Sequence, residues 1–183
     1  MTETDMTMNS HAGSLRRLAL AALLLVSPLA SVANGDLKIG DPFPDLSGLG
    51  LEGDLPTALR GSVLVVDFWA SWCAPCRHTF PLMEELHHRF GNRGLIILAI
   101  NEDKSRPAMN EFLKENPVTF RVLRDARKKL AVTVNIPGLP TSYLVDRNGK
   151  VQAIQSGEDI IQNRRAFVKK VQKLLDNTPK ILP

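Results

Sequence analysis

The two cysteines of this chain are separated by two residues, in the order Cys73-Ala74-Pro75-Cys76, and the sequence contains no other cysteine. They come shortly after the apolar run 63–68, which is typical of a buried strand. A Cys-x-x-Cys pair at a helix start places the first sulfur beside free backbone N–H groups, which favour the thiolate, and keeps the second sulfur within disulfide reach. The spacing therefore indicates thiol–disulfide exchange.

Two structural interpretations of the pair explain less. A structural zinc site needs four ligands, and the chain has no second cysteine pair and no histidine pair that completes such a set. A purely structural disulfide that spans only two residues removes little chain entropy. We therefore expect no metal at this position and a dithiol that is free to react.

Residues 1–33 have the features of a secretory signal. An arginine pair, Arg16-Arg17, precedes the apolar run 18–26, and small residues precede a cleavage position ahead of Asn34. The run is interrupted before it reaches the roughly twenty apolar residues that span a bilayer, which favours cleavage over an uncleaved membrane anchor. In both cases the domain is exported, to the periplasm or to the outer face of the cytoplasmic membrane.

Composition is consistent with one globular domain in residues 34–183. Of the 183 residues, 44% are hydrophobic and 23% are charged, which suits a packed core. The net charge of +4 is modest, and no nucleic-acid-binding motif accompanies it. The segment 121–129 is locally basic, and it is either a solvated face or a docking surface.

The order of the expected elements predicts a sheet with parallel strands. Strands at 63–68 and 95–100 flank a helix at 73–90 that should end at Gly91, and a strand-helix-strand crossover pairs its strands in parallel. The segment 34–61 is rich in Gly, Pro and Asp and is expected to be a loop-like extension packed on the domain.

The C-terminal half should continue with alternating elements. Ser105 can cap a helix, and the Asn-Gly pair at 148–149 predicts a hairpin turn. The expected elements are a helix at 105–116, a strand near 120–123, a helix near 128–134, hairpin strands at 141–145 and 151–155, and a helix at 159–175.

Four features together resemble those of a known family. They are Asp67-Phe68-Trp69-Ala70, Trp72-Cys73-Ala74-Pro75-Cys76, Pro81 and Leu139-Pro140-Thr141. With them the chain resembles the thioredoxin superfamily, in particular its exported TlpA/ResA-like branch, over residues 36 to 175. The resemblance implies an α/β, thioredoxin-like fold: a central mixed sheet with a C-terminal antiparallel hairpin, flanked by helices.

The resemblance also assigns catalytic roles. Cys73 is the expected nucleophile because it lies nearest the helix start and is the more exposed sulfur in this fold, and Cys76 resolves the mixed disulfide. Asp67 is costly to ionise in an apolar core, so its pKa should be raised and it could accept the proton of Cys76. Alternatively, Asp67 is a buried carboxyl satisfied by a backbone or water contact.

A second loop should face the dithiol. Pro140 is expected to be the cis-proline of this family, which would turn the Leu139 backbone toward an extended substrate. Trp69 is expected in the core. The residues implied in substrate binding are Trp72, Pro75, Leu139, Pro140 and Thr141.

The function that follows is an exported thiol–disulfide oxidoreductase without a cofactor. Ala74-Pro75 carries no positive group that would stabilise the Cys73 thiolate strongly, which favours a reductant or a weakly oxidising exchanger over a strong disulfide donor. The resemblance implies protein substrates such as apocytochrome c or copper-site cysteines, and a membrane-embedded electron donor. Nucleic acid is not expected as a partner. Contact with the membrane is expected only if the N-terminal segment stays uncleaved.

Other functions stay open at this point. A general disulfide oxidant or isomerase would use the same chemistry in the other direction. A copper metallochaperone would use Cys73 and Cys76 as Cu(I) ligands, which soft thiolates suit. A peroxidase is disfavoured because the chain has no Pro-x-x-x-Thr-x-x-Cys stretch.

Overall fold

The computed structural model describes residues 36–177, so the predicted leader at 1–33 lies outside the described residues. Within this part of the chain, no helix has the length and apolar character needed to cross a membrane. The elements, in chain order, are β1 (Val63–Trp69), α1 (Ala74–Phe90), the 3-10 turn η1 (Gly91–Arg93), β2 (Leu95–Asn101), α2 (Arg106–Glu115), β3 (Arg121–Arg124), α3 (Lys129–Val134), β4 (Thr141–Val145), β5 (Val151–Ser156), α4 (Gly157–Gln162) and α5 (Arg164–Asp176).

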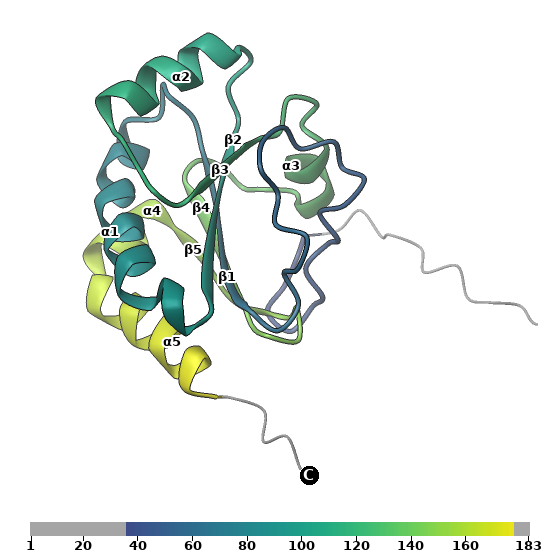
Figure 1. Ribbon diagram of the computed structural model, residues 1–183, viewed down its shortest axis with the longest axis vertical. Helices are drawn as coiled ribbons and strands as arrows, with labels where there is room; N and C mark the ends of the chain where they lie inside the picture. The colour runs from purple at the N-terminus through teal and green to yellow at the C-terminus, as the bar shows by residue number, and fades with distance from the viewer. Residues whose placement is uncertain (1–35, 178–183) are drawn as a thin grey trace, which may run out of the picture. The chain divides into compact units, whose positions relative to one another are not determined.

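The strands form one mixed sheet in the order β3-β2-β1-β4-β5. The β1–β2 and β2–β3 pairs are parallel, and β4 and β5 form the antiparallel hairpin next to β1. Helices α1, α2, α4 and α5 pack on one face, whereas α3 and the N-terminal extension cover the other (Figure 1). This arrangement confirms the predicted fold class.

Strand β1 is central because its side chains are apolar toward both faces. All seven of its residues are buried. Val63 and Val65 pack with the helices of one face, and Val66 and Phe68 pack toward α3 and the extension. Since side chains alternate along a strand, Asp67 lies on the same face as Val65, under the helices.

The extension shields both edges of the sheet. The Gly40 N–H donates to the Val151 carbonyl at 2.8 Å on β5, and the Glu52 N–H donates to the Arg124 carbonyl at 2.9 Å on β3. Open strand edges are sites of unwanted pairing with other chains, and a covering loop removes that hazard. The extension is therefore part of the folded domain.

Helix α1 ends at Phe90, where the sequence pattern predicted its end, and Gly91 is its C-cap residue. Gly91 has φ −54°, which is helical, and the chain continues through the turn η1. Gly94, with φ 91°, is the glycine in the left-handed conformation that ends the helical segment. The prediction that the helix stops at Gly91 is confirmed, and the left-handed glycine comes only after the added turn η1.

The last helix is two helices, which corrects the prediction of one helix at 159–175. Ser156 and Asp159 form a reciprocal capping box that starts α4 at Gly157, two residues earlier than expected. The chain leaves the helical conformation at Asn163, with φ −113°, and its carbonyl accepts from the Phe167 N–H at 3.1 Å. Asn163 thus begins α5 as a separate helix.

Candidate active site

The two cysteines lie at the start of α1 and are joined by a disulfide with 5.4 Å between their Cα atoms. Cys73 is the N-cap residue, in an extended conformation, and its N–H donates to the Ala70 carbonyl at 3.1 Å. Cys73 is 4% exposed, whereas Cys76 is fully buried. Of the two cysteines, Cys73 therefore retains the small remaining exposure, and it lies at the helix start beside the N–H groups of the first turn.

Asp67 lies in β1 directly opposite Ser142 of β4, and both are buried. The Ser142 hydroxyl donates to Asp67 Oδ1, while Asp67 Oδ2 has no hydrogen-bond partner among the described residues. Burial raises the pKa of Asp67 to about 7, and the Ser142 hydrogen bond opposes this shift only in part. The raised pKa agrees with the sequence-based expectation.

Pro140 precedes β4, and the Leu139–Pro140 peptide bond is cis, as the resemblance implied. The Gly157 N–H donates to the Pro140 carbonyl at 3.1 Å. A Cβ atom on Gly157 would lie 2.1 Å from Pro140 Cγ, a distance that no side chain tolerates. The sequence pattern did not indicate Gly157, because this close approach joins the start of α4 to the loop before β4, and no local pattern links the two.

The other residues of the implied substrate surface differ in exposure. Trp72 is 71% exposed, Pro75 is exposed and Leu139 is partly exposed. Thr141 is buried, and its hydroxyl donates to the Gly138 carbonyl at 2.8 Å, so it supports the loop from within. Trp69 is fully buried, which confirms its predicted place in the core.

A groove of about 540 Å³ opens next to the dithiol. Its walls include Trp72, which directly precedes Cys73, and Leu139, which directly precedes Pro140. The rest of its lining comes mainly from the segment after β2, the start of α2 and both ends of α3: Ser71, Glu102, Asp103, Lys104, Ser105, Ala108, Lys128 and Ile136.

Asp103 holds the turn that leads into Cys73. Its carboxylate accepts from the Ser71 N–H at 3.1 Å, the Ser71 hydroxyl at 2.9 Å and the Asn101 side-chain amide at 2.7 Å. The Asp103 N–H donates to Asn101 Oδ1 at 3.1 Å. Asp103 is buried, so these bonds fix the end of β2 to the end of β1.

Glu102 and Lys128 form an ion pair in the groove. Lys128 Nζ donates to Glu102 Oε2 at 2.8 Å and also to the Glu102 carbonyl. Burial raises the pKa of Glu102 to about 7, against the opposing effect of Lys128. Lys128 has φ 57°, a conformation that is costly for a non-glycine residue and that the surrounding contacts hold in place.

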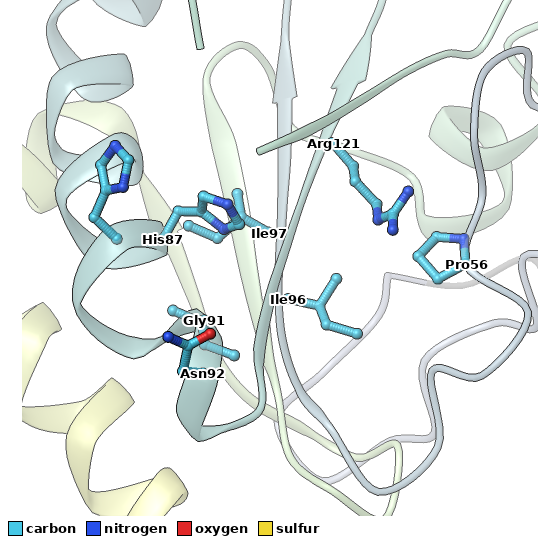
Figure 2. A pocket seen from close by; sticks show the side chains of 9 residues that line it. Pro56, His87, Gly91, Asn92, Ile96, Ile97 and Arg121 are labelled. Atoms are coloured by element: carbon cyan, nitrogen blue, oxygen red, sulfur yellow. The ribbon is translucent and has the colours of Figure 1, made fainter. Parts of the chain in front are cut away.

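A second hollow, of about 400 Å³, lies away from the cysteines, between the C-terminal half of α1 and the β2–β3 edge. Figure 2 shows the His87 side chain of α1 and the Arg121 side chain of β3 approaching it from opposite sides, with Ile96 of β2 between them. Arg121 forms an ion pair with Asp54, and His88 Nε2 lies 2.9 Å from Glu84 Oε1. Neither cysteine is among the residues that line this hollow.

Comparison with known proteins agrees with this geometry. Residues 39–154 match the AhpC/TSA family. A thiol-disulfide oxidoreductase ResA from Bacillus anthracis is 31% identical over 137 residues, which are 74% of this chain and 79% of that protein. The ResA protein of Geobacillus thermodenitrificans is 33% identical over 133 residues, 69% of this chain and 76% of that one.

A solved structure is similar in both fold and sequence. A Chlorobium tepidum protein assigned as thiol:disulfide interchange protein DsbE superposes with a TM-score of 0.68 and 33% identity. The match covers 76% of this chain and 99% of that one. The bonded Cys73–Cys76 pair lies at a helix start of the same thioredoxin-like architecture. The chain therefore belongs to the AhpC/TSA family and is a thiol–disulfide oxidoreductase of the ResA/DsbE type.

Proposed function

We propose that this oxidoreductase reduces disulfides of exported proteins, with Cys73 as the nucleophile. The observation that carries the proposal is the difference between the two cysteines: Cys73, at the start of α1, retains 4% exposure, and Cys76 is fully buried. A substrate sulfur meets Cys73 first. The Cys73 thiolate is favoured there by the N–H groups of the first helical turn.

The exchange has two steps. The Cys73 thiolate bonds to one substrate sulfur, the substrate S–S bond breaks, and the departing substrate thiolate takes up a proton. The Cys76 sulfur, once deprotonated, then bonds to Cys73 Sγ and releases the second substrate thiolate. The dithiol loses two electrons and becomes the disulfide seen in the structure, and the substrate disulfide becomes two thiols.

Asp67 is the proposed proton acceptor for Cys76. It lies on the helix-facing side of β1, in the core that also contains Cys76, and its Oδ2 is without a partner among the described residues. A group with a pKa near 7 is partly ionised at neutral pH and exchanges protons readily there. The Ser142 contact leaves this role intact because it occupies Oδ1 only.

The reducing direction follows from the residues between the sulfurs. Ala74 and Pro75 bring no cation to the Cys73 thiolate, so the reduced form is not stabilised as it is in strong oxidants. The exposed cation that follows, Arg77, forms an ion pair with Glu115 at 3.3 Å. A general oxidant or isomerase is the alternative that a measured potential separates from this proposal.

Export is proposed from the leader pattern in residues 1–33, which precedes the domain at 34–183. The proposed substrates are apocytochrome c or copper-site cysteines, with electrons from a membrane-embedded dithiol donor. These finer assignments rest on the resemblance to ResA-like proteins.

Trapping of the mixed disulfide tests the roles of the cysteines. In a Cys76→Ser variant, Cys73 should stay covalently joined to a peptide disulfide substrate, because no second sulfur releases it. Mass spectrometry should then find one peptide on Cys73. Cys73→Ser is the matched control and should trap nothing. Equal trapping by both variants, or trapping on Cys76 alone, would overturn the assignment.

A further inference from the structure

The side of the groove formed by the start of α2 carries surplus positive charge. Glu52 Oε2 accepts from Arg106 at 2.6 Å and from Arg124 at 2.9 Å. The Arg124 hydrogen bond lowers the pKa of Glu52, and the charges of Arg106 and Arg127 lower it further. Three guanidinium groups thus gather around one carboxylate, which neutralises only one of them.

This cluster is connected to the groove. Arg124 donates to the Lys104 carbonyl at 2.7 Å, and Lys104 lines the groove. Arg106 directly follows Ser105, another groove residue, and Arg127 directly precedes Lys128. Lys104, Arg106 and Arg127 are exposed, and we refer to these three residues as the basic rim.

The other carboxylates of this region are buried and are engaged within the protein. Asp103 accepts from Ser71 and Asn101. Asp125 accepts from the N–H groups of α3 at 2.9 and 3.0 Å. Glu102 is paired with Lys128. Among the described residues, Glu52 is therefore the one partly exposed carboxylate that contacts the basic rim.

Beside the basic rim the groove is apolar. Trp72 is largely exposed, and Ile136 and Leu139 are partly exposed. Apolar residues enclosed by charges of one sign favour a partner with a matching apolar side chain and charges of the opposite sign. The same charges also attract such a partner over a distance of about 10 Å at ordinary salt concentration.

We propose that the groove binds an extended, cysteine-bearing segment of a partner protein in which acidic side chains flank the cysteine. Its apolar side chain lies against Trp72, Ile136 and Leu139, and its carboxylates meet the basic rim. The inference rests on the proposed function, since the segment is a disulfide substrate of Cys73. The new element of the inference is that the substrate segment is negatively charged.

Two synthetic peptides test it. Both contain the same intramolecular disulfide and the same apolar residue, and they differ only in Glu or Lys at the flanking positions. The second-order rate constant for oxidation of the reduced full chain is measured with each peptide by stopped flow. At low salt we expect the Glu peptide to react about ten times faster, and the ratio to approach one in about 1 M salt.

Variants locate the effect. Lys104→Glu combined with Arg127→Glu should bring the ratio of the two rate constants to one or below it. Lys169→Glu with Lys170→Glu, an equal charge change on exposed residues of α5, should leave the ratio as in the wild type. Because the readout is a ratio, a general loss of folded protein does not imitate the expected result.

A neutral small disulfide, hydroxyethyl disulfide, separates the two proposals. If the wild type reduces it but reacts equally with both peptides, or faster with the Lys peptide, the substrate inference is wrong and the proposed function stands. If the reduced wild type oxidises with none of the three disulfides, the proposed function itself fails.

Discussion

Two buried carboxylates lie at the ends of neighbouring strands, and they are surrounded very differently. Asp67 in β1 accepts one hydrogen bond, from Ser142, and its second oxygen has no partner among the described residues. Asp103, just beyond β2, accepts from Ser71 and Asn101 through three donor groups. With one donor and one unpartnered oxygen, Asp67 suits the proposed proton exchange. With three donors, Asp103 holds a turn in place. The number of hydrogen-bond donors is thus the difference on which the proposed proton-accepting role of Asp67 depends.

The largest expected effect concerns stability against pH. The pKa of Asp67 is about 7 in the folded chain and 3.8 as the ordinary value, so between these the folded state binds the extra proton. The free energy of unfolding should therefore fall as pH rises from 4 to 7, by up to about 4 kcal/mol from this residue. Urea unfolding at several pH values should show a smaller fall for Asp67→Asn.

Glu102 contributes a slope of the same sign, since its pKa is also raised to about 7. The difference between the wild type and Asp67→Asn isolates the Asp67 part. Parallel pH curves for the two proteins would show that Asp67 ionises without cost.

Removal of the Asp103 carboxylate should cost stability at every pH. Asp103→Ala leaves the Ser71 N–H and the Asn101 amide without their acceptor, and the free energy of unfolding should fall by about 3 kcal/mol. Asp103→Asn retains one acceptor oxygen and should lose less. If the alanine variant were as stable as the wild type in urea, the turn would not depend on this carboxylate.

Asp67 should also affect rate. Asp67→Asn removes the proposed acceptor of the Cys76 proton, so release of the mixed disulfide should slow by about 100-fold at pH 7. Quenched-flow separation of the mixed disulfide from the products measures this step. Asp103→Asn serves as the comparison and should change it by less than about tenfold. Similar slowing in both variants would remove the distinction between the two carboxylates.

The smallest effect is expected from Ser142→Ala. The Ser142 hydrogen bond lowers the pKa of Asp67, so its loss should move the pH dependence of mixed-disulfide release to higher pH. The free energy of unfolding should fall by about 1 kcal/mol. A shift to lower pH, seen in the rate profile, would contradict the direction of this interaction.

Local patterns predicted most of the elements in this fold. The apolar run of β1, the Ser105 cap of α2 and the Asn-Gly turn each act within a few residues. The end of α1 at Gly91 was predicted as well, but the turn η1 that follows it and closes at Gly94 was not. The break at Asn163 depends on a capping geometry that the apolar stripe of the predicted helix does not register.

Site residues could be predicted from the sequence where the residue type and its position in an element indicate the chemistry. Cys73, Cys76 and Asp67 stand out by type and position, but their partners come from distant parts of the chain. Ser142 meets Asp67 through the β1–β4 register, and Asp103 reaches Ser71 across 32 residues. Such contacts depend on strand pairing, which no local pattern in one sequence specifies.

The reduction potential of the Cys73–Cys76 couple, measured against glutathione in the purified protein, decides whether the dithiol reduces or oxidises its substrates. We expect a value near about −270 mV, as in thioredoxin, because no cation between the sulfurs stabilises the Cys73 thiolate. A value near about −120 mV, as in DsbA, would mean that the dithiol form is the stabilised one and that the protein oxidises its substrates.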